Sequence, residues 1–296
     1  MIDNVLILGS GYIGKNLTSK LISLGDVKSV ENVRQSFLNY KDEDKLREYL
    51  IKGKPNYLIN ASGYTGSPNV EGCENNWQDC YWMNVVVPVR IAKVCKELDI
   101  PFINIGSGCI YDNQDKIYSE YDMPNFGIFS NRSSFYSKTK HLCEEKLQDH
   151  HAYTFRIRIP FNSEVVSKNY LYKLIKYDNL INEKNSITGL EMLGDFTNFF
   201  MKLEKKPEYG AYNVCNEGIV RGGEVSEMMA EHGLKNPNWQ IKTYDEMNFR
   251  VHRSNCMLSN MKIESLGYKP KKVRDELYEC IKNFSYALKN ISNNQA

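Results

Sequence analysis

A stretch near the start of the chain decides its fold, and it reads Val5-Leu6-Ile7-Leu8-Gly9-Ser10-Gly11-Tyr12-Ile13-Gly14. Its four apolar residues are typical of a short buried strand, and a helical pattern of apolar residues continues as far as Leu24. Between a strand and a helix, the first glycine permits a tight turn, the second lets backbone approach a phosphate, and the third allows close helix packing. Amides at the helix N-terminus then face the phosphates. The stretch predicts a dinucleotide-binding loop, with an ordinary glycine turn as the alternative, and its candidate residues are Gly9, Gly11, Tyr12, Ile13 and Gly14.

The rest of the first half alternates strand-like and helix-like segments. Strands are expected at 57–60, 102–106 and 153–159, and helices at about 77–98 and 135–148. This alternation predicts βαβ units, and therefore an α/β fold of the Rossmann type with a doubly wound parallel sheet. Such a sheet binds its ligands at the carboxyl ends of its strands.

The pattern becomes less regular after Pro160, which is expected to stop the last of these strands. We predict a dinucleotide-binding domain formed by residues 1–160 together with about 186–217. Residues of about 161–185 and 218–296 are expected to form a smaller mixed C-terminal lobe that binds the substrate.

The composition disfavours several classes of function. The 38 Lys and Arg against 36 Asp and Glu give a formal net charge of +2, so no overall field attracts nucleic acid or an anionic membrane. The eight cysteines are scattered without a C-x-x-C pair, so neither a zinc site nor a redox motif is indicated. No apolar run suits a signal peptide or a membrane span. We expect a cytoplasmic protein with reduced thiols and no metal.

The five histidines show no metal-ligand spacing with carboxylates. His252 is adjacent to Arg253 and is therefore a candidate neighbour of a phosphate. The remaining four are interpreted as surface residues, and they are His141, His150, His151 and His232.

Two charged residues follow the glycine loop at the distance where an adenosine ribose is read. Glu31 lies seventeen residues past Gly14 (31 − 14), near the spacing of the acid that binds the ribose of NADH. Arg34 lies three residues further and is a candidate for the 2′-phosphate of NADPH. Solvated surface charges are the alternative for both. We favour NADPH slightly, with NADH as the alternative cofactor.

A tyrosine and a lysine stand one helical turn apart in Tyr136-Ser137-Lys138-Thr139-Lys140. Side chains at i and i+4 share one face of a helix. An ammonium beside a phenol favours the phenolate, so Lys140 is expected to lower the pKa of Tyr136 from about 10. Tyr136 can then pass a proton to a developing alkoxide near neutral pH. The alternative is an ordinary pair on a surface helix.

Three further features favour the catalytic interpretation. Ser107 follows the strand at 102–106, where a hydroxyl can bond a substrate carbonyl. Asn60-Ala61-Ser62-Gly63 closes the strand at 57–60, where a cofactor crosses the edge of the sheet. Asn84 is a polar residue inside the helical pattern at 77–98, and an exposed helix position is its alternative.

The glycine loop, Ser107, Tyr136 and Lys140 together resemble the extended short-chain dehydrogenase/reductase superfamily. Longer strings narrow the resemblance to the nucleotide-rhamnose synthase/epimerase-reductases, and the bacterial dTDP-4-dehydrorhamnose reductases look like more distant relatives. These strings are residues 60–74, 106–111, 134–140, 156–160 and 253–255. One departure affects the detail of the glycine loop, because the first two glycines of those relatives are spaced one residue wider.

The resemblance implies a two-part reaction on a 4-keto-6-deoxy nucleotide sugar, for which UDP is the expected nucleotide. C3 and C5 are epimerised, and the C4 ketone is then reduced by NAD(P)H to give a nucleotide L-rhamnose. Ser107 and Tyr136 are implied to hold the C4 oxygen, which stabilises the enolate of both epimerisations. The resemblance also implies a cofactor contact at Pro160, and substrate contacts at Thr65, Asn69 and Arg253.

Epimerisation requires one group that removes a proton and another that returns one from the opposite face. Cys109 lies two residues past Ser107 on an extended segment, so both side chains can point the same way, and its thiol is the candidate base. Lys173 lies in a segment that resembles the family's lysine-bearing segment after a one-residue gap, and it is the candidate acid. A small buried hydrophobe and a solvated helix lysine are the respective alternatives.

Two other functions fit the sequence. In a pure 4-reductase, Cys109 and Lys173 have no catalytic part. In a non-catalytic NADP-binding regulatory subunit, the fold only binds a partner, although retention of both Tyr136 and Lys140 argues against this. Because long helices such as 77–98 often pair in this superfamily, we expect a homodimer.

Overall fold

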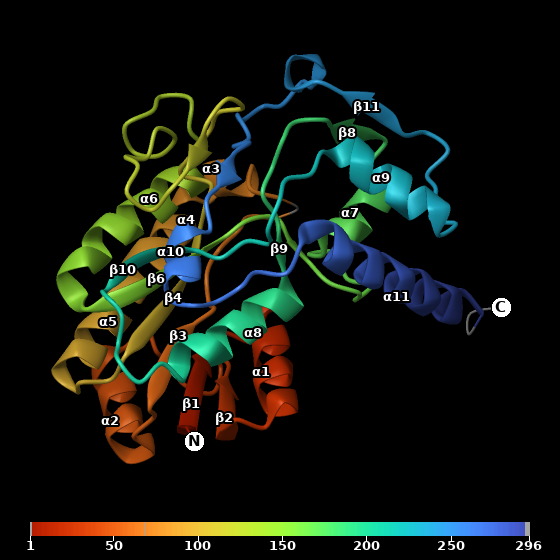
Figure 1. Cartoon of the computed structure of the whole chain (residues 1–296). Coiled ribbons are helices and arrows are strands. Elements are labelled where there is room, and N and C mark those ends of the chain that lie inside the picture. The colour runs from red at the N-terminus through yellow and green to blue at the C-terminus, as the bar shows by residue number, and fades with distance from the viewer. Residues whose placement is uncertain (1, 68, 294–296) are drawn as a thin grey trace.

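The computed structural model describes residues 2–67 and 69–293. At its centre lies a six-stranded sheet in the order β10-β6-β4-β3-β1-β2, whose neighbouring strands are all parallel. The strands are β1 (Ile2–Leu8), β2 (Val27–Val33), β3 (Tyr57–Asn60), β4 (Phe102–Ser107), β6 (Ala152–Ile157) and β10 (Gly210–Asn213). The chain enters at β1, one strand in from the edge, passes to the edge strand β2 and then crosses back to β3, β4, β6 and β10 on the other side, which confirms the predicted Rossmann-type α/β fold (Figure 1).

Helices cover both faces of this sheet, because successive side chains of a strand point to opposite faces. Val5 and Ile7 join one apolar core with α1 and α8, whereas Leu6 and Leu8 join the other core with α2, α5 and α6. The bounds of these helices are α1 (Tyr12–Leu24), α2 (Glu43–Gly53), α5 (Val87–Glu97), α6 (Phe135–Leu147) and α8 (Leu190–Met201). The run of four apolar residues in β1 is therefore buried from both sides.

The helical pattern predicted at 77–98 is confirmed as one helical segment with an irregular turn. It begins as α4 (Trp77–Tyr81), passes through a π-helical turn at Trp82–Val86 and continues as α5. The short helix α3 (Gly72–Asn75) precedes it. The π turn contains Asn84, and π turns inside helices are frequent at functional sites.

A smaller body of the chain has its own apolar core, on the right-hand side of Figure 1. It contains α7 (Tyr170–Lys176), α9 (Gly222–Glu231) and α11 (Val273–Asn293), beside the parallel pair β8 (Asn179–Ile181) and β11 (Gln240–Lys242). The remaining elements are β5 (Ile117–Tyr118) paired with β12 (Met257–Leu258), α10 (Met261–Ser265), and 3-10 turns at Gln148–His150 and Tyr244–Glu246. The domain boundaries stated above stay a prediction.

The structure corrects two local predictions. The strand expected at 153–159 ends at Ile157, and Pro160 begins a new strand, β7 (Pro160–Phe161), which pairs with β9 (Thr188–Gly189). Proline is tolerated there because the first residue of a strand need not donate to the ladder. His141 was expected on the surface but is buried, and its Nδ1 accepts a hydrogen bond from Ile128 N at 3.2 Å. Gly127 makes the room, since a Cβ there would lie 2.2 Å from that nitrogen.

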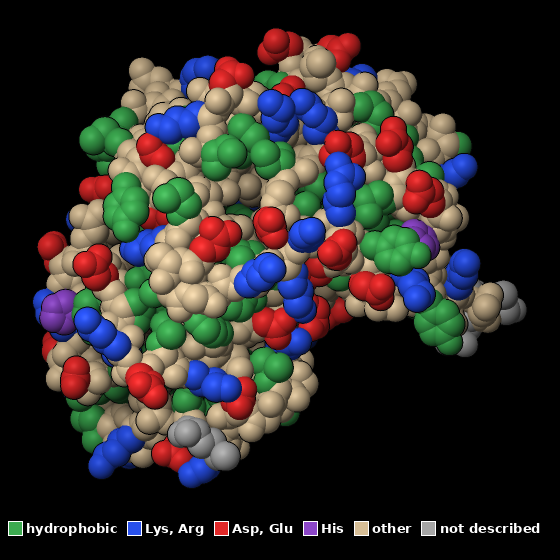
Figure 2. Space-filling view, in the orientation of Figure 1, with side chains coloured by type: hydrophobic (Ala, Val, Ile, Leu, Met, Phe, Trp, Pro, Cys, Tyr) green, Lys and Arg blue, Asp and Glu red, His purple; other side chains and the backbone are tan. Residues whose placement is uncertain are grey.

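The surface in Figure 2 mixes Lys and Arg with Asp and Glu over the visible face, in keeping with the small formal net charge of +2. Within the described ranges, no helix is both long and apolar enough to cross a membrane. The eight cysteines are free, and Cys109 alone of them is not fully buried.

Candidate active site

The glycine loop has the geometry that its three glycines predict. Gly9 has a φ of 99°, and a Cβ on it would lie 2.7 Å from Ser62 N in the loop after β3. A Cβ on Gly14 would lie 1.9 Å from Gly9 O, so α1 packs directly on the turn. A Cβ on Gly11 would meet open space, and this glycine caps α1 without a side-chain hydrogen bond. Backbone amides at the N-terminus of a helix that begins in such a loop can bind a phosphate.

A neighbouring side chain holds this turn in place. Asn32 of β2 donates its amide to Gly9 O at 3.0 Å. Glu31 accepts a hydrogen bond from the Tyr49 hydroxyl, whereas Arg34 follows β2 with an exposed side chain. Arg34 is thus an exposed side chain just past the carboxyl end of β2, whereas Glu31 is engaged by Tyr49. Asn32 was missed from the sequence, because a polar residue in a half-buried strand gives no sign of its partner.

Two buried asparagines shape the loop that follows β3. Asn60 donates to Asn104 Oδ1 at 2.8 Å and accepts from Ser62 N at 3.1 Å. Asn84 accepts from Tyr64 N and donates to Tyr64 O, both at 2.8 Å. The alternative of an exposed position for Asn84 is wrong, since its side chain is 1% exposed. Asn84 holds the loop after β3 through the backbone of Tyr64. A direct contact of Asn84 with the cofactor stays a prediction.

Ser107, Tyr136 and Lys140 meet where β4 ends. Ser134 caps α6 by accepting from Ser137 N at 3.1 Å, which fixes the first turn that carries Tyr136. Lys140 Nζ lies 5.8 Å from the centre of the Tyr136 ring and 3.5 Å from Ile105 O. It also lies near the loop after β3, because a Cβ on Gly63 would be 3.6 Å from it.

The protonation of this group differs from the sequence-based expectation. Burial raises the pKa of the Tyr136 phenol, against the lowering effect of a hydrogen bond with Ser107. Burial also lowers the pKa of Lys140. A lower pKa reduces the fraction of Lys140 that carries the positive charge, and that charge was expected to favour a phenolate at Tyr136. Tyr136 is consequently a protonated phenol at neutral pH, which is the form that can donate to an alkoxide.

Cys109 lies against Ser107 and against a buried arginine. Its backbone N donates to Ser107 Oγ at 3.2 Å, and its Sγ accepts from Arg158 Nη1 at 3.0 Å. Arg158 stands just past β6 and was not singled out from the sequence. The available signal was a pair of arginines alternating with isoleucines in Arg156-Ile157-Arg158-Ile159, directly before Pro160.

Lys173 belongs to a cationic group beside this site. Burial lowers its pKa, and the nearby cations Lys168 and Arg253 lower it further. Lys168 Nζ lies 3.3 Å from Thr65 Oγ1. Arg253 Nη2 donates to Asn69 Oδ1 at 3.2 Å and forms an ion pair with Glu71 at 2.9 Å.

The cationic group connects to Cys109 through neighbouring residues. Ser254 follows Arg253, and both its hydroxyl and its carbonyl oxygen accept from Arg158, at 3.2 and 3.0 Å. Arg158 in turn contacts Cys109 Sγ. The structure therefore gathers the predicted substrate residues into one region, but records no direct contact between Lys173 and Cys109.

The backbone next to Pro160 is strained. Ile159 has a φ of 38°, in the left-handed region that β-branched residues rarely adopt. It lies between Arg158 and Pro160, past the carboxyl end of β6. Strain of this kind is retained where the surroundings enforce it, often at ligand sites.

The comparison with protein families agrees with this geometry. Residues 3–286 match the model described as the RmlD substrate binding domain. The chain belongs to this family. It is 32% identical over 202 residues to a bifunctional dTDP-4-dehydrorhamnose 3,5-epimerase/dTDP-4-dehydrorhamnose reductase of Arabidopsis thaliana, which covers 65% of this chain and 64% of that protein.

A trifunctional UDP-glucose 4,6-dehydratase/UDP-4-keto-6-deoxy-D-glucose 3,5-epimerase/UDP-4-keto-L-rhamnose-reductase of Arabidopsis thaliana is 31% identical over 215 residues, which is 70% of this chain. The match spans only 31% of that relative's length. Among solved structures, the L780 UDP-rhamnose synthase of Acanthamoeba polyphaga mimivirus gives a TM-score of 0.83 at 22% identity, covering 95% of this chain and 99% of that one. A dTDP-4-dehydrorhamnose reductase of Bacillus anthracis in complex with NADP gives 0.80 at 16% identity, with 97% and 100% covered.

Proposed function

We propose that this family member reduces the C4 ketone of a 4-keto-6-deoxy nucleotide sugar with NADPH, after epimerising the sugar at C3 and C5. The single observation that carries the reduction is the meeting of Ser107, Tyr136 and Lys140 at the end of β4, beside the loop after β3. The carboxyl ends of β1, β3 and β4 adjoin there, which is where a Rossmann sheet binds its ligands.

The cofactor proposal rests on the open space at Gly11 and the free N-terminus of α1. Gly9, Gly14 and Asn32 hold that turn, and Arg34, just past β2, is the residue proposed to bind the 2′-phosphate that distinguishes NADPH from NADH. When bound, the nicotinamide supplies a hydride to C4. The other proposed contacts of the cofactor are Tyr12, Ile13, the loop 60–63, Asn84, Lys140 and Pro160.

The residues of this chain supply the proton for the reduction. Ser107 holds the C4 oxygen by a hydrogen bond, and Tyr136 donates its phenolic proton to that oxygen as the alkoxide develops. Lys140, one helical turn from Tyr136, stabilises the phenolate that remains. Because burial lowers the pKa of Lys140, this stabilisation acts when the lysine carries its proton.

The epimerisation uses the same ketone. Protons at C3 and C5 are acidic because both carbons flank it, and Ser107 and Tyr136 stabilise the enolate oxygen. Cys109 is the base on one face of the sugar ring, and its backbone N donates a hydrogen bond to Ser107 Oγ. Lys173 is the acid on the other face, and its lowered pKa eases proton donation near neutral pH.

The nucleotide end of the substrate is assigned to the cationic group. Arg253 and Lys168 can neutralise a diphosphate, with Thr65 and Asn69 beside them. UDP is the proposed nucleotide. A homodimer also stays a prediction.

NADPH oxidation with 4-keto-6-deoxy nucleotide sugars tests the reduction directly. Tyr136→Phe removes the proton donor and should lower kcat by roughly 10²–10⁴-fold, the usual worth of general acid catalysis. Its NADPH affinity should stay close to wild type. A Tyr136→Phe enzyme with near wild-type turnover would remove Tyr136 from the mechanism, and a protein that binds NADPH without oxidising it would be a regulatory subunit.

The epimerisation has a separate test. Cys109→Ala and Lys173→Ala should each stop deuterium from entering C3 and C5 in heavy water. Both variants should still reduce a ketosugar that another enzyme has already epimerised. If Cys109→Ala forms the rhamnose product from the unepimerised ketosugar at the wild-type rate, the chain is a pure 4-reductase.

A further inference from the structure

Arg158 is a buried cation that contacts a thiol. Its side chain is 2% exposed, and its hydrogen bonds go to Cys109 Sγ, Ser254 and Asn185 Oδ1. Among the residues that the structure describes, none hydrogen-bonds to its Nε. Within residues 2–67 and 69–293, no ion pair joins this guanidinium to an acid. Burying a charge is costly unless an opposite charge compensates it.

A second arginine two residues earlier gives a matched comparison. Arg156 is 3% exposed, and it forms an ion pair with the Glu144 carboxylate through both Nε and Nη2. The two arginines are thus buried to the same degree at the end of β6. Where Arg156 has a carboxylate, Arg158 has the Cys109 thiol.

Cys109 is the cysteine that contacts the Arg158 guanidinium directly. Cys215 and Cys256 also lie near Arg158, but burial raises their pKa values to about 12 and about 11. They therefore stay neutral at physiological pH. Cys109 differs from them in being partly accessible and in directly accepting a hydrogen bond from Arg158 at 3.0 Å.

We propose that Arg158 and Cys109 form a guanidinium–thiolate pair, and that Arg158 thereby keeps Cys109 in the form that a base requires. A charge-assisted hydrogen bond to an arginine stabilises a thiolate and fixes its direction. The catalytic part of this inference rests on the proposed epimerisation. Arg158 itself is a positioning residue, because it acts through Cys109.

The proton transfer balances with the groups present. The Cys109 thiolate takes the proton from C3 or C5, the C–H electron pair forms the enolate double bond, and the carbonyl pair moves to the C4 oxygen. The Lys173 ammonium then gives a proton to the opposite face of that carbon, and the carbonyl re-forms. Exchange with solvent returns Cys109 to the thiolate and Lys173 to the ammonium.

Several other ionisable groups face Cys109. Tyr136 and Lys140 face it from α6, and Cys256 faces it from the segment before β12. The Tyr136 phenol and the Cys256 thiol are neutral at pH 7, because burial raises the pKa of each. Lys140, like Arg158, favours an anion at Cys109 when it carries its charge.

The rate of Cys109 alkylation by iodoacetamide, followed by peptide mass spectrometry, tests the pair in the whole protein. An unassisted thiol with a pKa near 8.5 alkylates roughly 100-fold more slowly at pH 6.5 than at pH 9.5. We expect wild-type Cys109 to differ by less than about tenfold between these pH values. A full 100-fold dependence in the wild type overturns the proposal, and this measurement needs no variant to fold.

Arg158→Gln keeps donors at the position but removes the charge, and Arg158→Lys restores the charge. In Arg158→Gln, Cys109 should be alkylated about tenfold more slowly than in wild type at pH 6.5 and equally fast at pH 9.5. In Arg158→Lys, most of the alkylation rate at pH 6.5 should return. Cys109→Ser identifies the labelled peptide. A loss that persists at pH 9.5 means changed access, which contradicts the proposal.

The pair and the proposed function can fail separately. If the alkylation results hold but Cys109→Ala still incorporates deuterium at C3 and C5, the ion pair stands and the epimerase assignment fails. If Arg158→Gln slows that incorporation by about tenfold while it reduces a pre-epimerised ketosugar normally, both stand.

Discussion

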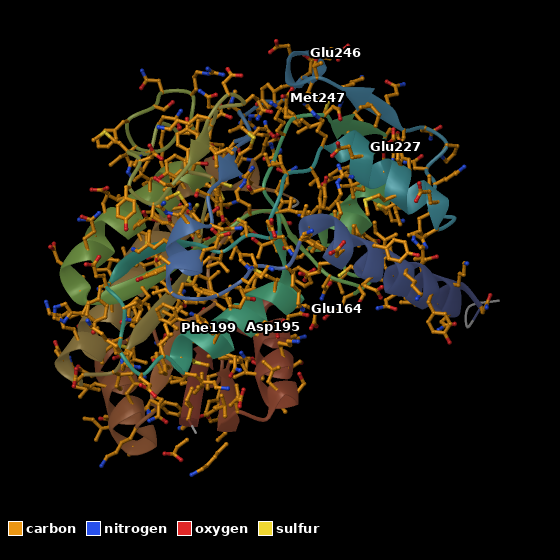
Figure 3. All side chains as sticks on the ribbon, viewed as in Figure 1. Glu164, Asp195, Phe199, Glu227, Glu246 and Met247 are labelled. Carbon is orange, nitrogen blue, oxygen red and sulfur yellow. The ribbon has the colours of Figure 1, made fainter. Side chains whose placement is uncertain are left out.

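The Tyr12 hydroxyl donates a hydrogen bond to Asn162 Oδ1 at 2.7 Å, across 150 residues of sequence. Tyr12 begins α1 in the glycine loop, and Asn162 Nδ2 donates back to Asn16 Oδ1 of the same helix at 2.7 Å. Asn169, which caps α7, donates to the Asn162 and Glu164 carbonyl oxygens, both at 2.7 Å. The labelled Glu164 marks this segment in Figure 3. The loop proposed to hold the cofactor is therefore joined to the helix that carries Lys173.

Tyr12→Phe should lower the free energy of unfolding by about 1 kcal/mol, because it removes one partly buried hydrogen bond and leaves the ring in place. Urea unfolding measures the change. Tyr49→Phe is the matched control, since its hydroxyl bonds an exposed Glu31, and it should cost much less. Equal losses in the two variants would mean that the Tyr12 contact does not join the two parts of the protein.

Arg34→Ala should raise the KM for NADPH by about 10- to 100-fold, the worth of hydrogen bonds to a charged phosphate. The KM for NADH should change little, because NADH lacks the 2′-phosphate. Steady-state kinetics with both cofactors measure the difference. Equal effects on the two cofactors would reject Arg34 as the specificity residue and would direct attention to Glu31.

Lys173→Met should abolish epimerisation and yet raise the melting temperature at pH 7. Burial, followed by the cations Lys168 and Arg253, lowers the pKa of Lys173 below its unfolded value, so folding is opposed while the lysine is charged. The folded state then binds fewer protons than the unfolded state between the two pKa values, and stability rises with pH through that window.

The variant should lack this rise between neutral pH and about pH 10. Thermal unfolding across that range measures it. Lys176→Met on the same helix is the control, because Lys176 is exposed and its replacement should leave the profile unchanged. A lower melting temperature for Lys173→Met would show that the lysine stabilises the fold and is not held there at a cost.

Local patterns sufficed for the elements that begin the fold. The β3 prediction at 57–60 has the bounds of the observed strand, and the glycine loop lies between β1 and α1 as expected. These features depend on hydrophobic periodicity and on glycine geometry, and both are determined by residues that are close together in the sequence.

The sequence could not give contacts between distant segments. Arg158 contacts Cys109 across 49 residues of sequence and Ser254 across 96. No local sequence pattern at any of these residues indicates which distant residue it contacts. The pKa of Tyr136 was expected to fall because Lys140 is one turn away, but the depth of burial decides its direction. Burial is a property of the whole fold, as the enclosed His141 also illustrates.

The product formed from UDP-4-keto-6-deoxyglucose and NADPH in heavy water tests the central claim most directly. NMR should show a nucleotide L-rhamnose with deuterium at both C3 and C5, formed while NADPH is consumed. Deuterium enters those carbons only if their protons are removed and replaced from solvent, whereas the hydrogen at C4 comes from the cofactor. A reduced sugar with ordinary hydrogen and unchanged configuration at C3 and C5, or no consumption of NADPH, would contradict the account.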